Sequence, residues 1–163
     1  MPVNVENHFE NNRMDAMKIL MVDDNDDDFF FFKHAVTKLG EPIELFRATD
    51  GLEAQAYLSE TDPQANRCNP PLPDVLVSDL DMPRCDGLEL LRWFKTKPEP
   101  KPVPFVLTAS ATPSNQMAIT DLGARAYFTK PADVGDWSRI VTQIITAAAD
   151  ALGQKAITPK DCL

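Results

Sequence analysis

The sequence has few of the residues that build disulfide frameworks or metal-thiolate sites. Its three cysteines, Cys68, Cys85 and Cys162, form no CxxC pair and have no histidine cluster nearby. We therefore expect free thiols and no zinc site. Long apolar runs are also missing, since none approaches the roughly 20 residues that cross a bilayer. Because a signal-peptide pattern is absent as well, we expect a cytoplasmic protein with no membrane partner.

Basic residues are outnumbered. The chain has 16 Lys and Arg against 25 Asp and Glu, which gives a formal net charge of -9. Nucleic acids and anionic membranes are bound through basic patches that displace counterions. The charge argues against nucleic acid as a general partner and favours another protein.

A length of 163 residues allows one well-buried core and is too short for two ordinary domains with a linker. We divide the chain into an N-terminal tail over 1–16, one domain over 17–149 and a C-terminal tail over 150–163. A Pro- and Asn-rich loop over 60–73 is interpreted as an insertion within the domain.

Short apolar runs alternate with longer amphipathic ones along the domain, which is typical of βα units around a parallel sheet. The sequence predicts an α/β fold with strands at 19–22, 43–48, 75–78, 103–107 and 126–129. It predicts helices at 28–39, 52–59, 88–97, 114–122 and 133–149. On the last helix an apolar stripe at helical spacing should pack on the sheet; it consists of Val134, Trp137, Val141, Ile144 and Ala148.

Polar side chains follow four of the predicted strands. Asp23 and Asp24 follow the first strand, Asp79 the third, Thr108 the fourth and Lys130 the fifth. Ligands of open parallel sheets bind at the carboxyl ends of the strands, so we expect these side chains to meet there. Three neighbouring carboxylates repel one another unless a cation or raised pKa values offset the charge. Oxygen ligands of this kind favour Mg²⁺ completed by phosphate oxygens.

An aspartate can attack phosphorus when cations offset the charge on the phosphoryl oxygens. Asp79 is the best-placed nucleophile, with Lys130 and Thr108 as donors to the phosphoryl oxygens. Each residue also has a plainer explanation. The aspartates and the threonine can be helix caps, and the lysine can belong to a surface turn. Their joint placement at the ends of four strands favours the site.

The motifs ILMVDDN, DGLEA, SDLDMPRCDGLELL, LTAS and GARAYFTKP resemble the response-regulator receiver family over about residues 17–149. The resemblance implies a doubly wound, flavodoxin-like five-stranded parallel sheet in the order 2-1-3-4-5. It implies Asp79 as phosphoryl acceptor and Mg²⁺ ligand and Asp24 as direct ligand. Asp23 would act mainly through water and Asp81 through its backbone carbonyl.

The family also implies a switch in which Thr108 moves toward the phosphoryl group and Tyr127 turns inward behind it. The Lys130–Pro131 bond is expected to be cis. The donor would be a histidine kinase or a phosphotransfer protein, and a protein target would follow downstream. The long loop and the lack of an output domain resemble single-domain regulators that serve phytochrome-type kinases. A homodimer through the fourth helix, fifth strand and fifth helix is left open.

Four consecutive phenylalanines open the first helix. At about 100° per residue, Phe29 and Phe32 lie on the buried face and Phe31 on its flank, while Phe30 points outward beside His34. In the family the outer face of this helix docks on the kinase, so Phe30, Lys33 and His34 are predicted to meet the partner. The acids that precede the phenylalanines, at 26–28, are expected to cap the helix.

Two other functions compete. Asp79-Leu80-Asp81 resembles the DxD of aspartate-nucleophile phosphohydrolases, although in that class the paired acids come after the nucleophile. The other alternative is a binding module that works without phosphorylation. We expect no enzyme, but a stoichiometric acceptor with at most self-dephosphorylation.

Overall fold

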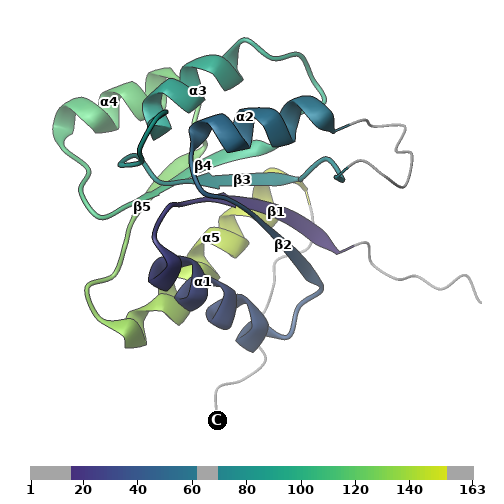
Figure 1. The fold of residues 1–163 in the computed structure, drawn as a ribbon. Helices are drawn as coiled ribbons and strands as arrows, with labels where there is room; N and C mark the ends of the chain where they lie inside the picture. Colours follow the sequence, from purple (N-terminus) through teal and green to yellow (C-terminus); the bar gives the residue numbers. More distant parts are fainter. Residues whose placement is uncertain (1–15, 62–69, 154–163) are drawn as a thin grey trace, which may run out of the picture.

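The computed structural model describes residues 16–61 and 70–153, which form one five-stranded sheet covered by helices on both faces (Figure 1). The strands are all parallel and lie in the order β2-β1-β3-β4-β5. Their bounds are β1 Met17–Val22, β2 Ile43–Ala48, β3 Val75–Ser78, β4 Val103–Thr108 and β5 Ala126–Thr129. The predicted flavodoxin-like fold class and strand order are confirmed.

The helices form two layers. In Figure 1, α1 and α5 cover one face of the sheet, and α2, α3 and α4 cover the other. Their bounds are α1 Asp26–Leu39, α2 Gly51–Glu60, α3 Gly87–Lys95, α4 Pro113–Asp121 and α5 Trp137–Ala151, with a short 3₁₀ turn, η1, at Val134–Asp136.

The central strand β1 is apolar on both faces, as a strand between two helical layers must be. Its side chains alternate: Ile19 and Met21 join the core beneath α1 and α5, whereas Leu20 and Val22 join the core beneath α2 and α3. This alternation follows from the period of two in a strand. Strand β1 therefore packs against both helical layers.

Polar caps fix where the helices begin on the carboxyl side of the sheet. Asn25, Asp50 and Asp86 each accept a hydrogen bond from an amide three residues on, and Asp86 forms a full capping box with Glu89. Such caps satisfy amides that have no partner within the helix. The caps therefore help to fix the starts of these helices next to the strand ends.

Two expectations about helices need correction. The last helix was predicted from 133, but α5 begins at Trp137, because η1 is a tighter turn that breaks the helical period. Val134 is consequently 57% exposed, whereas the other members of its predicted stripe are buried. The helix cap predicted among the acids at 26–28 is instead Asn25.

Part of the sequence interpretation falls outside the described residues. Residues 1–15, 62–69 and 154–163 include Cys68, Cys162, most of the insertion loop and most of both tails. Cys85 is described, and it is a buried free thiol. Within 16–61 and 70–153, no helix combines the length and the apolar character that crossing a bilayer requires.

Candidate functional site

The ends of β1 and β3 bring the predicted acids together. The Asp23 amide donates to the carbonyl of Ala48 at 3.0 Å, and the Asp79 amide donates to that of Val22 at 2.9 Å, so the sheet pairing extends to both acids. Asp23, Asp24 and Asp79 each offer a carboxylate oxygen, and these oxygens all lie within 4.8 Å of one another. The predicted convergence is therefore observed for these three side chains.

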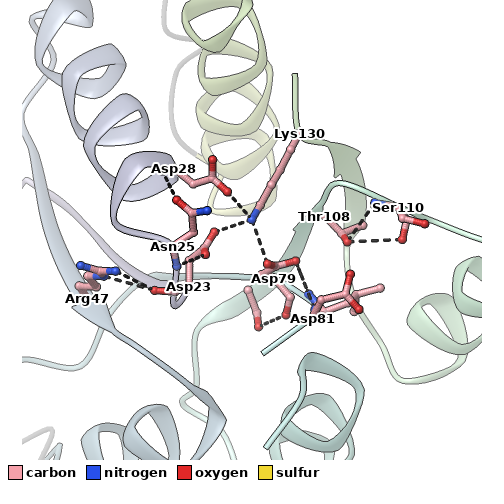
Figure 2. Close-up of polar contacts among 11 residues, drawn as sticks. Asp23, Asn25, Asp28, Arg47, Asp79, Asp81, Thr108, Ser110 and Lys130 are labelled. Carbon is pink, nitrogen blue, oxygen red and sulfur yellow. Dashed lines mark hydrogen bonds and ion pairs between the residues drawn. The ribbon is translucent and has the colours of Figure 1, made fainter. Parts of the chain in front are cut away.

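Asp79 is buried and its carboxylate is oriented from two sides (Figure 2). Its Oδ1 accepts a hydrogen bond from the amide of Leu80 at 2.7 Å and a longer one from Asp81 at 3.4 Å. Its Oδ2 accepts from Lys130 Nζ at 2.9 Å. The carboxylate borders an open, acidic depression of about 620 Å³ that is also lined by Asp24, Asp81, Ala109 and Lys130. The Asp79 carboxylate therefore faces an opening to the surface on this side.

Lys130 places its ammonium among carboxylates. Its side chain is only 8% exposed, and Nζ lies 2.7 Å from Asp23 Oδ2, 2.7 Å from Asp28 Oδ2 and 2.9 Å from Asp79 Oδ2. Burial by itself would lower the pKa of Lys130, but the contacts with these aspartates outweigh it and raise the pKa above its ordinary value. The side chain is thus a fixed cation beside Asp79.

Asp23 is almost completely buried, and its two oxygens are treated differently. Oδ1 accepts from the Asn25 amide at 2.9 Å. Oδ2 forms the ion pair with Lys130 outside hydrogen-bonding geometry and has no other partner within 16–61 and 70–153. Burial raises the pKa of Asp23 even though Lys130 and the Asn25 amide favour its charged form. A buried carboxylate oxygen without a hydrogen bond, next to two further carboxylates, fits a hard divalent cation such as Mg²⁺.

Thr108 and Tyr127 occupy different places relative to the acids. Thr108 is fully buried at the end of β4. In the part of the chain that the structure describes, its hydroxyl makes only long contacts, of 3.4 Å, with the amide and the carbonyl of Ser110. Tyr127 is 38% exposed and borders a depression with Pro113, Gln116 and Met117 of α4. The structure therefore holds Tyr127 in an outward position, away from the carboxylates.

Sequence reasoning missed two charged residues that touch the cluster. Asp28, which was expected only to cap the first helix, pairs with Lys130. Arg47 of β2 donates to the backbone carbonyl of Asp23 from Nε at 3.3 Å and from Nη2 at 3.2 Å, and pairs with Asp26 at 2.8 Å. Neither contact has a local sequence signal, because the partners come from different elements. The expected cis bond is also wrong: Lys130–Pro131 is trans, the isomer that most X–Pro bonds adopt.

The outer face of α1 has the predicted exposure. Phe30 is 62% exposed and stacks on His34 with ring centroids 6.2 Å apart, while Phe32 is fully buried. Lys33 and His34 are exposed on the same face. The three residues predicted to meet a partner are therefore accessible.

Comparison with known proteins identifies the family. The model of the response regulator receiver domain matches residues 19–142. The response regulator Rcp1 of Synechocystis sp. is 34% identical over 102 residues, which cover 62% of this chain and 67% of that protein. The response regulator MprA of Mycobacterium avium is 35% identical over 115 residues, which cover 71% of this chain but only 45% of MprA. This chain thus spans less than half of that relative.

Two solved structures have the same fold. The phosphorylated cyanobacterial phytochrome response regulator RcpA is similar with a TM-score of 0.69 and 32% identity, covering 79% of this chain and 91% of that one. The Mn²⁺-bound form of Rcp1 is similar with a TM-score of 0.69 and 25% identity, covering 89% of this chain and 99% of that one. With the acids gathered at the carboxyl edge of the sheet, these matches show that the chain belongs to the family of response regulator receiver domains of two-component signalling.

Proposed function

We propose that this chain accepts a phosphoryl group on Asp79 from a histidine kinase or a phosphotransfer protein, in a Mg²⁺-dependent reaction in the cytoplasm. One observation carries the proposal: Asp79 lies within 4.8 Å of two other carboxylates and also receives the buried ammonium of Lys130 at 2.9 Å. A nucleophilic carboxylate next to a cation and a metal-binding cluster is what phosphoryl transfer requires.

In the transfer, an oxygen of Asp79 forms a bond to phosphorus while the bond between phosphorus and the donor imidazole nitrogen breaks. The imidazole leaves with the electron pair of that bond. The Leu80 amide and Lys130 orient the Asp79 carboxylate, and Lys130 remains close enough to donate to a phosphoryl oxygen. Thr108 supplies a second donor once its hydroxyl turns from Ser110.

Mg²⁺ would be held by Asp24, Asp79 and the Asp81 carbonyl, with Asp23 mainly through water, and would offset the charge on the phosphoryl oxygens. The protein's own part is to hold the ligands. Asp23 is fixed by the amide of Asn25 and Asp79 by that of Leu80. The relative Rcp1 has been solved with Mn²⁺ bound, which supports a divalent ion here.

The signal would pass through Thr108 and Tyr127. The Thr108 hydroxyl makes only 3.4 Å contacts, which are weaker than ordinary hydroxyl hydrogen bonds, so a phosphoryl oxygen can attract it. The Tyr127 side chain, which now points outward, would then rotate inward. This would change the surface that Tyr127 forms with α4, which a downstream protein target would recognise.

The kinase would dock on α1 through Phe30, Lys33 and His34. An exposed phenylalanine stacked on histidine forms an aromatic anchor of the kind that partner proteins bury. The likeness to RcpA favours a phytochrome-type kinase as the donor. Phe30→Ala should slow phosphotransfer from the cognate kinase and leave the reaction with a small phosphodonor unchanged. Equal rates of phosphotransfer from the kinase to Phe30→Ala and to the parent would contradict docking at this surface.

The decisive experiment measures mass. The protein is incubated with Mg²⁺ and acetyl phosphate, and we expect one PO₃ per chain on Asp79 and none without Mg²⁺. Asp79→Asn should gain no mass, whereas Asp121→Asn, a charge-matched change at an exposed residue of α4, should behave like the parent. Steady turnover of small phosphate esters would favour the phosphohydrolase. A chain that never gains mass but still binds its partner would favour the binding module.

A further inference from the structure

The Lys130 ammonium has three N–H groups and three carboxylate neighbours. An ammonium carries three donors, and here Asp23, Asp28 and Asp79 lie within 2.7–2.9 Å of Nζ. Figure 2 shows the Lys130 side chain reaching between Asp28 and Asp79. Asp28 and Asp79 accept hydrogen bonds from Nζ, whereas Asp23 attracts it only as an ion pair.

Asp28 differs from the other two carboxylates. Asp23 and Asp79 belong to the group whose oxygens lie within 4.8 Å of one another, and Asp28 does not. Both of the former would also have to serve a divalent ion and, in the case of Asp79, carry the phosphoryl group. Asp28 would neither bind the ion nor carry the phosphoryl group. Of these three carboxylates it is therefore the one that can stay paired with Lys130 through the whole reaction.

Asp28 is itself held firmly. It lies in the first turn of α1, and its amide donates to the side chain of Asn25, the helix cap, at 3.0 Å. At the other end of the lysine, the Lys130 amide donates to the carbonyl of Thr108 at 2.8 Å. The flexible four-carbon stem of a lysine is thus anchored at its backbone by β4 and at its head by α1.

We propose that Asp28 is a positioning residue that holds the Lys130 ammonium against Asp79 so that one N–H faces the group that is phosphorylated. The inference rests on the proposed function of Asp79. It assigns to α1 a part in the chemistry besides that of a docking surface.

The first test needs neither metal nor phosphodonor. Acetic anhydride is added to the metal-free protein, and the rate of Lys130 acetylation is followed by peptide mass spectrometry. The parent should react slowly, because the lysine side chain is only 8% exposed and paired. In Asp28→Ala the rate should rise about tenfold, the factor expected from the loss of one charge-assisted hydrogen bond. Asp28→Asn keeps an acceptor without the charge, so its rate should rise about threefold.

Asp27→Ala is the matched control. It removes the same charge from the same turn of α1, and its side chain is exposed, without a hydrogen bond or ion pair among the described residues. Its Lys130 rate should equal that of the parent. The exposed Lys33 and Lys38 provide internal standards that should react equally in every variant. Equal Lys130 rates in Asp28→Ala, Asp27→Ala and the parent would overturn the proposal. If Asp28→Ala does not fold, an unchanged rate in Asp28→Asn would do so.

The second test measures phosphorylation of Asp79 by phosphoramidate with Mg²⁺. The rate should fall about tenfold in Asp28→Ala and less in Asp28→Asn. Asp27 also lines the acidic depression, and Asp27→Ala should show no such fall. The two tests separate the two proposals. If the parent gains no phosphoryl group but Lys130 reacts faster in Asp28→Ala, the proposed function alone is contradicted. A parent that is phosphorylated while Lys130 reacts equally in all variants contradicts the positioning role alone.

Discussion

Gly87, the first residue of α3, packs against the backbone of Asp79 and Leu80. A Cβ atom on Gly87 would lie 2.8 Å from the Cα of Leu80 and closer still to the carbonyl oxygen of Asp79. The Gly87 amide also donates to the carbonyl of Leu80 at 2.9 Å. Only a residue without a side chain lets α3 begin this close to the proposed phosphoryl acceptor.

Gly87→Ala should therefore disturb both stability and the site. Forcing a methyl group against backbone atoms should lower the free energy of unfolding by about 1–3 kcal/mol, and the displaced Asp79 should be phosphorylated more slowly. Urea unfolding and the rate of mass gain measure the two effects. Gly135→Ala is the control, because its nearest contact would be Asp133 Oδ1 at an ordinary 3.4 Å. Equal stabilities of the two variants would contradict the close packing.

Phe32 and Phe30 give a second prediction within one helix. Phe32 is fully buried on the inner face of α1, whereas Phe30 is 62% exposed on its outer face. Phe32→Ala should lower the free energy of unfolding by about 3–5 kcal/mol, because it leaves a cavity in the core. Phe30→Ala should change it by less than about 0.5 kcal/mol. Chemical denaturation of both variants checks this, and a comparable loss in each would mean that α1 is rotated from its described orientation.

The orientation of α1 could be predicted from sequence because it depends only on a helical period. Four adjacent phenylalanines give no amphipathic signal by themselves, but Ala35, Val36 and Leu39 fix which face is apolar. The ends of the strands were predictable for a similar reason. Parallel strands deliver their carboxyl ends to one edge, so Asp23, Asp79 and Lys130 had to meet once the strands were located.

Other features depend on distances between elements and have no sequence signal. Asp26, Asp27 and Asp28 look interchangeable in the sequence, yet the first pairs with Arg47 and the third with Lys130. Which acid faces which cation is decided by how α1 packs against β2 and the end of β5. The break before α5 was missed because Val134 fits the helical stripe although it lies in a 3₁₀ turn.

Asp50 connects stability to pH. It caps α2 through the Glu53 amide and accepts two hydrogen bonds from Arg84, a residue with a left-handed φ of 66°. Burial alone would raise the pKa of Asp50, but the hydrogen bonds from Glu53 and Arg84 outweigh it and lower the pKa below its ordinary 3.8. Because the pKa is lower in the folded than in the unfolded state, charged Asp50 stabilises the fold at neutral pH. That contribution is lost as the pH falls through the folded-state pKa.

Asp50→Asn keeps the cap but loses the charge that Arg84 binds. We expect it to lower the free energy of unfolding by about 1–2 kcal/mol at pH 7. This difference in the free energy of unfolding should shrink below pH 3.8, because Asp50 of the parent then becomes protonated as well. Urea titrations between pH 7 and pH 3 measure this. Asp133 is the control, because among the described residues its side chain bonds only the Gly135 amide. The difference in the free energy of unfolding between Asp133→Asn and the parent should not shrink at low pH. A constant difference for Asp50→Asn would show that the Arg84 pair contributes nothing.

Thr108 and Tyr127 provide the test of signalling. Thr108→Val keeps the buried shape and removes the hydroxyl, whose present contacts are 3.4 Å long, so stability should change by only about 1 kcal/mol. Phosphorylation by acetyl phosphate should still occur, because Asp79 and Lys130 remain. In the parent and in Thr108→Ser, phosphorylation should reduce nitration of Tyr127 as its ring turns inward, and in Thr108→Val it should not.

Tyr57 of α2 serves as the reference in the same samples, since its hydroxyl donates to the Pro71 carbonyl at 3.1 Å. Its nitration should be the same in every sample. If Tyr127 is protected equally in phosphorylated Thr108→Val and in the parent, the tyrosine responds to the phosphoryl group without the threonine hydroxyl. The path from Asp79 to the α4 surface would then run through another element, for which the β3–α3 loop that carries Asp81 is the nearest candidate, because its backbone already contacts Asp79.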